Sequence, residues 1–175
     1  MKALFTDIDG VLNSASSAEM YFAFLKHDDP GMNRFYNSSD LIKFKPNLGP
    51  DCTVSEFCPL AVSNYNYILR EVPDLKVVIS SYWRLGRSIE DLQSIFKWLG
   101  LPHDRIIGKT PSIHGVQRGV EIKDWLSKNP EVTKYAVIDD DSDMDVIDPG
   151  CFFHIDSYNG LIYTQALEII KHFKN

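Results

Sequence analysis

A chain of 175 residues in which 44% are hydrophobic and 24% are charged has the composition of an ordinary globular domain. Its formal net charge of -6 argues against an extended basic groove for nucleic acid and against binding to an anionic membrane surface, but leaves room for a small phosphate pocket. The three cysteines form no close pair, which excludes a disulfide framework and favours a reducing, cytoplasmic setting. No signal peptide and no apolar run of membrane-spanning length is visible.

Short apolar runs and amphipathic stretches alternate along the chain. The runs predict β-strands over residues 2–7, 75–80, 105–107, 134–139 and 151–156. The amphipathic stretches predict helices over residues 16–27, 59–72, 88–99, 118–129 and 163–173. Strands that alternate with helices form right-handed β-α-β units around a parallel sheet. We therefore predict an α/β fold, a Rossmann-like three-layer α/β/α domain with a central parallel sheet.

Residues 28–58 interrupt this alternation. They are rich in proline, glycine, asparagine and serine, yet they also contain aromatic residues that a flexible linker would lack. We expect residues 14–58 to form a small cap or flap insertion after the first strand, within a single domain spanning residues 1–175. The aromatic side chains have two readings that stay open here: a lid that stacks a base over the site, and a small core of the insertion itself.

Polar and acidic side chains follow three of the predicted strands, namely Asp7 and Asp9, Ser80 and Ser81, and Asp139 and Asp140. The carboxyl ends of parallel strands meet at one edge of the sheet, where ligands bind in this class of fold. Clustered carboxylates repel one another, and a hard divalent cation such as Mg²⁺ offsets that repulsion. An EF-hand is excluded, since Met144 and Gly150 stand at the sixth and twelfth positions counted from the first acid of the last group.

Three of these segments resemble the motifs of the haloacid dehalogenase-like (HAD) superfamily. "FTDIDGV" matches its first motif, "VVIS" resembles the second, and "YAVIDDDSD" resembles the fourth, all in the family's order. More narrowly, "SSYWR", "RGVEIKDWL" and "HIDSYNGL" are similar to small HAD domains of phage and bacterial proteins associated with RNA repair. The resemblance implies a HAD-like fold and a phosphatase, because HAD dehalogenases and P-type ATPases lack the second acid of the first motif.

The resemblance also assigns roles to individual residues. It implies that Asp7 is the nucleophile, which forms an aspartyl-phosphate, and that Asp9 is the general acid and base. Ser80 would hydrogen-bond the transferring phosphoryl group, with Ser81 as the alternative. Gly10 lets the chain turn sharply after the acids and is assigned with Ser81 to substrate binding.

The implied metal site would use the Asp7 carboxylate, the Asp9 backbone carbonyl and an acid of the last group. Asp140 is the first choice for that acid, and Asp139 would help directly or through water. Asp143 would hold a metal-bound water. The implied ion is Mg²⁺.

A basic residue should offset the charge on the nucleophile and the phosphate, as the third motif of the family does. The family has lysine at this position, whereas this chain has Arg118 there, and Lys109 and Lys123 compete for the role. We expect Lys123 to point to solvent. Arg84 has two readings, a contact with a substrate phosphate or carboxylate and a structural ion pair.

These observations predict a Mg²⁺-dependent phosphomonoester hydrolase that acts on a nucleotide or a polynucleotide-end phosphate. The narrower resemblance favours such a substrate, and a small cap would leave the site open to a nucleic-acid end. The acidic net charge favours a small phosphorylated metabolite instead. The alternative from another class is a non-catalytic HAD-like binding module. The sequence makes no prediction about the oligomeric state.

Overall fold

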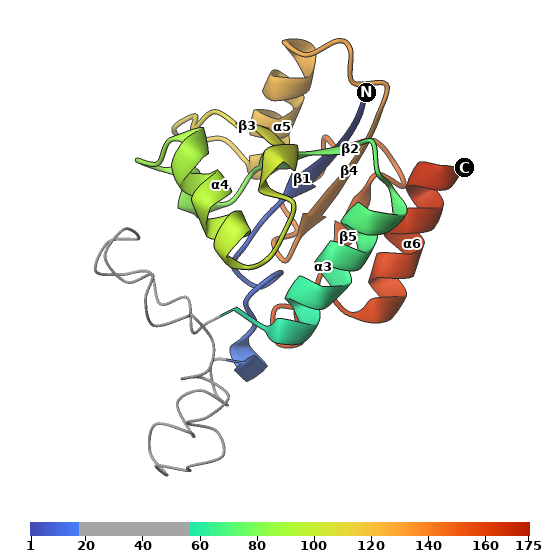
Figure 1. Cartoon of the computed structure of the whole chain (residues 1–175). Helices are drawn as coiled ribbons and strands as arrows, with labels where there is room; N and C mark the ends of the chain where they lie inside the picture. Colours follow the sequence, from blue (N-terminus) through green and yellow to red (C-terminus); the bar gives the residue numbers. More distant parts are fainter. Residues whose placement is uncertain (18–56) are drawn as a thin grey trace, which may run out of the picture.

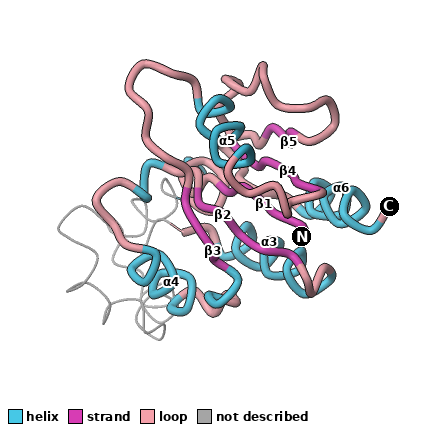
Figure 2. Tube along the Cα trace, turned by 90° about the horizontal axis from the view of Figure 1, so that it is seen from above, coloured by secondary structure: helices cyan, strands magenta, loops and turns pink. Residues whose placement is uncertain are grey.

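The computed structural model describes residues 1–17 and 57–175. Its centre is a five-stranded, all-parallel sheet in the order β3-β2-β1-β4-β5, whose strands are labelled in Figure 2. The strands are β1 (Lys2–Thr6), β2 (Leu75–Ile79), β3 (Ile106–Lys109), β4 (Lys134–Asp139) and β5 (Phe152–His154). The predicted α/β fold with a central parallel sheet is confirmed.

Helices follow β1, β2, β3 and β5 as the sequence predicts (Figure 1), whereas a loop joins β4 to β5. They are α3 (Pro59–Glu71), α4 (Ile89–Trp98), α5 (Arg118–Ser127) and α6 (Tyr163–Lys174), with 3₁₀ turns η3 (Tyr82–Arg84) and η4 (His103–Arg105). Local sequence explains where α4 begins, because Ser88 and Asp91 form a reciprocal capping box. Most element boundaries lie within two residues of the predicted ones. The small differences arise because the last residue of an apolar run often lies just past the hydrogen-bonded part of the strand.

The predicted insertion over residues 14–58 lies outside the described residues, apart from 14–17 and 57–58. The same holds for most of the predicted helix over residues 16–27. In the part of the chain that the structure describes, no helix combines the length and the hydrophobicity needed to span a bilayer.

Two layers of helices cover the sheet, and the alternation of side chains along each strand decides which residues meet which layer. Leu4 and Val77 belong to the larger apolar core, which the sheet forms with α3, α4 and α6. Phe5, Val78 and Val137 face the opposite way and pack with α5. Strands buried on both faces need such continuous apolar runs, which is why β1, β2 and β4 could be recognised in the sequence.

The same alternation orients the residues that follow three of these strands. Continued by two residues, it places Asp7, Ser80 and Asp139 on the α5 side of the sheet. The backbone pairing also runs past the strand ends, because the amide of Asp7 donates to the carbonyl of Ile138 and the amide of Ser80 donates to the carbonyl of Thr6, both at 3.0 Å. These three side chains are therefore held at one edge of the sheet, in front of the start of α5.

Candidate active site

Three carboxylates converge at the carboxyl ends of β1 and β4. Asp7, Asp139 and Asp140 each offer one oxygen, and these oxygens all lie within 4.8 Å of one another. Asp7 is 5% exposed and Asp139 is fully buried. Burial, followed by the charge of Asp7, raises the pKa of Asp139 to about 8, and burial also raises the pKa of Asp7.

This group fits a divalent cation. Asp139 Oδ2 is buried and has no hydrogen-bond partner among the described residues, while its Oδ1 accepts from the amide of Asp141 at 3.0 Å. A carboxylate oxygen without a hydrogen-bond partner beside two further carboxylates is an unfavourable arrangement that a bound cation relieves. Both acids of the prediction, Asp139 and Asp140, therefore belong to the cluster.

Arg118 is the cation of this cluster. Its Nη1 lies 3.6 Å from Asp7 Oδ1 and 3.6 Å from Asp139 Oδ2, and the same nitrogen donates to the carbonyl of Ser80. The side chain is 8% exposed. Although burial opposes the charged form, the carboxylates of Asp7 and Asp139 raise the pKa of Arg118 above its ordinary value.

The start of α5 holds this arginine in place. The backbone amide of Arg118 donates to Asp143 Oδ2 at 2.8 Å, and the amide of Gly119 donates to the carbonyl of Asp143 at 3.3 Å. A Cβ at position 119 would lie 3.2 Å from that carbonyl oxygen, so glycine permits the close approach. Asp143 Oδ2 thus caps the helix that carries the arginine. Its Oδ1 is buried and has no hydrogen-bond partner among the described residues, and the expected role of Asp143 in holding a metal-bound water stays a prediction.

The two competing lysines lie elsewhere. Lys109 Nζ donates to the backbone carbonyls of Arg84 and Arg87. Lys123 Nζ contacts Asp148 Oδ1 at 2.7 Å and Tyr135 Oη at 3.3 Å. Lys123 lies at the surface as expected, with its side chain 35% exposed, and its ammonium group contacts the tyrosine and the carboxylate there.

Asp9, the second acid of the first motif, is itself exposed, but two donors hold its carboxylate. Asp9 Oδ1 accepts from the indole Nε1 of Trp83 at 2.9 Å and from the side-chain amide of Asn13 at 2.8 Å. Asn13 Oδ1 in turn accepts from the amide of Gly10 at 2.8 Å. Phe57 packs edge-on against the Trp83 ring, with centroids 5.3 Å apart. Neither Trp83 nor Asn13 belongs to a motif that reveals this role in the sequence, although Trp83 follows the β2 strand end and Asn13 stands four residues after Asp9.

Gly10 is required by space as well as by backbone conformation. Its φ is +71°, and a Cβ at this position would lie 2.3 Å from Asp140 Oδ2. The chain therefore turns against one of the three clustered carboxylates, and a side chain here would displace that carboxylate.

The two serines after β2 differ in their contacts. Ser80 Oγ is buried and has no hydrogen-bond partner among the described residues. The Ser81 side chain hydrogen-bonds Asp7, which helps to lower the pKa of that acid against the effect of burial, and Ser81 Oγ accepts from the amide of Trp83 at 3.4 Å. Ser80 thus has an unused hydroxyl beside the cluster, whereas Ser81 orients the nucleophile candidate.

Of the two roles predicted for Arg84, the structure shows the structural ion pair. Its Nη2 lies 2.5 Å from Glu121 Oε2, with side chains 4% and 7% exposed. Its other donors bond the carbonyls of Ser80, Ser81, Thr110 and Pro111. A guanidinium has five N–H donors, and these contacts use all of them. No donor of Arg84 remains for a substrate.

An all-parallel α/β sheet whose central strand ends in D-x-D, beside a strand that ends in paired acids, defines the class of HAD-type hydrolase domains. A family model described as the HAD domain in Swiss Army Knife RNA repair proteins matches residues 3–166, and the chain belongs to this family. The HAD domain implies a hydrolase of the phosphatase type. Comparisons with curated proteins and with solved structures find no significant match.

Proposed function

We propose that this protein is a Mg²⁺-dependent phosphomonoester hydrolase that forms a phosphoenzyme on Asp7. The observation that carries the proposal is the convergence of Asp7, Asp139 and Asp140 within 4.8 Å, with a buried guanidinium 3.6 Å from the first of them. Mg²⁺ prefers oxygen ligands and commonly joins protein carboxylates to substrate phosphates. When bound, it would offset the negative charge of the phosphoryl oxygens.

Each residue of the site has a separate role in the proposed reaction. An Asp7 oxygen attacks phosphorus, the bond from phosphorus to the ester oxygen breaks, and Asp9 gives that oxygen a proton. Asp9 next takes a proton from the water that hydrolyses the aspartyl-phosphate. Trp83 and Asn13 hold the Asp9 carboxylate for both transfers. Arg118 offsets charge on Asp7 and on the incoming phosphate.

For the substrate, we propose a phosphate on a nucleotide or at the end of a polynucleotide. The family description, which names RNA repair proteins, supports this class. We place the activity in the cytoplasm, because the sequence has no close cysteine pair. The net charge of -6 favours a small phosphorylated metabolite as the second candidate.

The test is hydrolysis of a substrate panel with Mg²⁺ and with EDTA. The panel contains an aryl phosphate, 3′- and 5′-nucleotides, and oligonucleotides phosphorylated at either end. We expect Mg²⁺-dependent release of phosphate that EDTA abolishes, and a loss of at least about a thousandfold in kcat for Asp7→Asn, because the nucleophile is removed.

Asp124→Asn is the matched control for this substitution. Asp124 lies on α5 and pairs with Lys128 on the helix surface, so the same chemical change there should leave turnover unchanged. Activity that survives Asp7→Asn would contradict the mechanism. Mg²⁺ binding without turnover of any substrate would favour a non-catalytic binding module instead.

Trp83→Phe should impair substrates that need a protonated leaving group. The substitution removes the indole N–H from Asp9 and keeps an aromatic ring against Phe57. General acid catalysis contributes about 10²–10⁴-fold, and we expect about a tenfold loss in kcat/KM for nucleotides. We use kcat/KM because it reports the first phosphoryl transfer.

p-Nitrophenyl phosphate separates this role from a structural one. Nitrophenolate leaves without a proton, so its kcat/KM should fall by less than about threefold in Trp83→Phe. Trp125→Phe, on α5 and packed edge-on against Phe5, is the control and should alter neither substrate. Equal losses on both substrates in Trp83→Phe would show that the indole supports the fold and does not position Asp9.

A further inference from the structure

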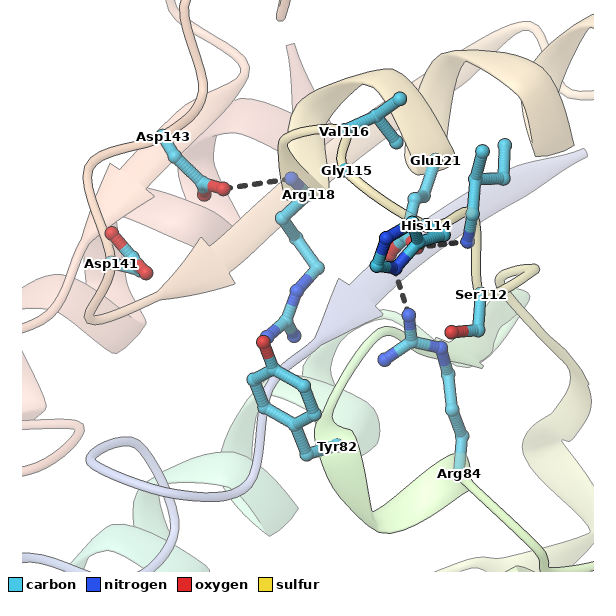
Figure 3. Close-up of a pocket in the computed structure, with 11 residues that line it drawn as sticks. Tyr82, Arg84, Ser112, His114, Gly115, Val116, Arg118, Glu121, Asp141 and Asp143 are labelled. Carbon is cyan, nitrogen blue, oxygen red and sulfur yellow. Dashed lines mark hydrogen bonds and ion pairs between the residues drawn. The ribbon is translucent and has the colours of Figure 1, made fainter.

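A pocket of about 250 Å³ opens beside the carboxylate cluster (Figure 3). It lies between the 3₁₀ turn η3 and residues 112–116, at the start of α5. Arg118 belongs to both places, since it lines the pocket and its Nη1 lies 3.6 Å from Asp7 Oδ1. A phosphate bound at Asp7 would therefore lie at the Arg118 end of this pocket.

Tyr82 presents an aromatic ring at the edge of the pocket. It is 69% exposed, whereas its neighbours in η3, Trp83 and Arg84, are 8% and 4% exposed. The hydrogen bonds of those two residues anchor the turn and leave Tyr82 directed outward. Figure 3 shows the ring beside the Arg118 side chain, and the guanidinium carbon lies 5.1 Å from the ring centroid. An exposed ring held beside a guanidinium is a platform on which a planar group stacks.

The chemistry of the lining disfavours a second phosphate as the occupant. Asp141 and Asp143 line the pocket, and their negative charges repel an anion. The charge of Glu121 is offset by its ion pair with Arg84. All donors of Arg84, the second arginine there, are already used. The lining instead offers the carboxylates of Asp141 and Asp143. These groups suit a neutral planar ring that carries N–H donors.

The volume of the pocket also limits the size of the ligand that it can hold. Pockets for drug-sized ligands measure about 300–1,000 Å³, so a pocket of about 250 Å³ holds one small ring system. A nucleobase has a planar face that would stack on Tyr82. It also has N–H groups that would donate hydrogen bonds to the carboxylates.

We propose that Tyr82 stacks the base of the nucleotide that bears the scissile phosphate, so that the enzyme selects a terminal nucleoside and not a phosphate alone. This inference rests on the proposed function and adds the residue and the pocket that read the substrate. Tyr82 is in this view a specificity-determining residue. It acts on substrate binding and takes no part in the transfer of the phosphoryl group.

The test compares two oligonucleotides that differ only in the base of their phosphorylated terminal residue, one normal and one abasic. Stacking on an aromatic side chain contributes about 1–3 kcal/mol per base, which corresponds to about 5–150-fold in affinity. We expect Tyr82→Ala to lower kcat/KM about tenfold for the normal end and to leave the abasic end unchanged. Tyr82→Phe should retain the wild-type value, because the ring is kept. Tyr163→Ala, which removes another exposed tyrosine at the start of α6, is the control.

A binding measurement keeps this inference separate from the proposed function. Calorimetric titration of the Asp7→Asn variant with 3′- and 5′-AMP and with ribose 5-phosphate needs no turnover. Adding Tyr82→Ala should weaken AMP binding about tenfold and leave ribose 5-phosphate unchanged. Equal effects of Tyr82→Ala on both ligands, or on both oligonucleotides, would overturn the inference, as would no effect on any of them. If the wild-type protein hydrolyses no substrate of the panel, the proposed function is rejected, and the calorimetric test of base stacking on Tyr82 still stands.

Discussion

Replacing Arg118 with glutamine is expected to lower kcat by at least about 100-fold, the effect of removing one preorganised electrostatic donor from an active site. The guanidinium is the cation that contacts both Asp7 and Asp139 in the described part of the chain. Without it, two buried carboxylates face each other and the incoming phosphate with less compensation. The measurement is steady-state turnover of the best substrate of the panel at saturating Mg²⁺, with circular dichroism to verify that the variant is folded.

Two further variants make this result specific. Lys123→Gln neutralises a cation one turn further along α5, where it pairs with Asp148, and should keep nearly full activity. Arg118→Lys should recover part of the loss, because a lysine supplies charge but lacks the planar fork of donors. A kcat for Arg118→Gln within a fewfold of wild type, or an equal fall in Lys123→Gln, would contradict the assignment of Arg118 to the third-motif role.

Glu121→Gln is expected to lower the free energy of unfolding by about 3–5 kcal/mol, the usual cost of removing one partner of a buried ion pair. The substitution leaves the Arg84 guanidinium charged and buried. Glutamine keeps an oxygen for the amide of Ile113, which Glu121 Oε1 now accepts at 2.7 Å, so charge is the main change. Since natural domains are stable by about 5–15 kcal/mol, a shift of this size should be plain in urea unfolding.

Glu71→Gln is the matched control for that prediction. Its partner is Lys174, at a surface site where the Glu71 and Lys174 side chains are 34% and 50% exposed, and such surface pairs contribute about 0–1 kcal/mol. If Glu121→Gln unfolds at the same urea concentration as Glu71→Gln, the Arg84–Glu121 pair does not stabilise the fold.

The sheet and its acidic edge were predictable because their signals are local. Strands buried on both faces need continuous apolar runs, and an acid directly after such a run marks a strand end whatever lies around it. Asp7 and Asp139 therefore stand where the sequence places them, and the alternation along β1 and β4 brings both to the side of α5.

Contacts between distant segments could not be predicted in this way. The pairing of Arg84 with Glu121 depends on how η3 meets α5, and either residue alone has the appearance of an ordinary surface charge. The bond from Trp83 to Asp9 depends on the direction of an indole ring in a three-residue turn. The sequence pattern does not determine the direction of the ring. The ring direction results from packing, here against Phe57, and can be read only from the folded structure.

The position of β1 at the centre of the sheet affects how the protein folds during its synthesis. The first strand along the chain finds its neighbours only in β2, from Leu75, and β4, from Lys134. During synthesis, an emerging chain therefore carries the "DIDG" segment long before it can carry the site. Pairings between segments so far apart in sequence close late and slowly. The acids that follow β1 and β4 meet only after the chain has been made as far as Asp140, so the carboxylate cluster cannot form before β4 exists.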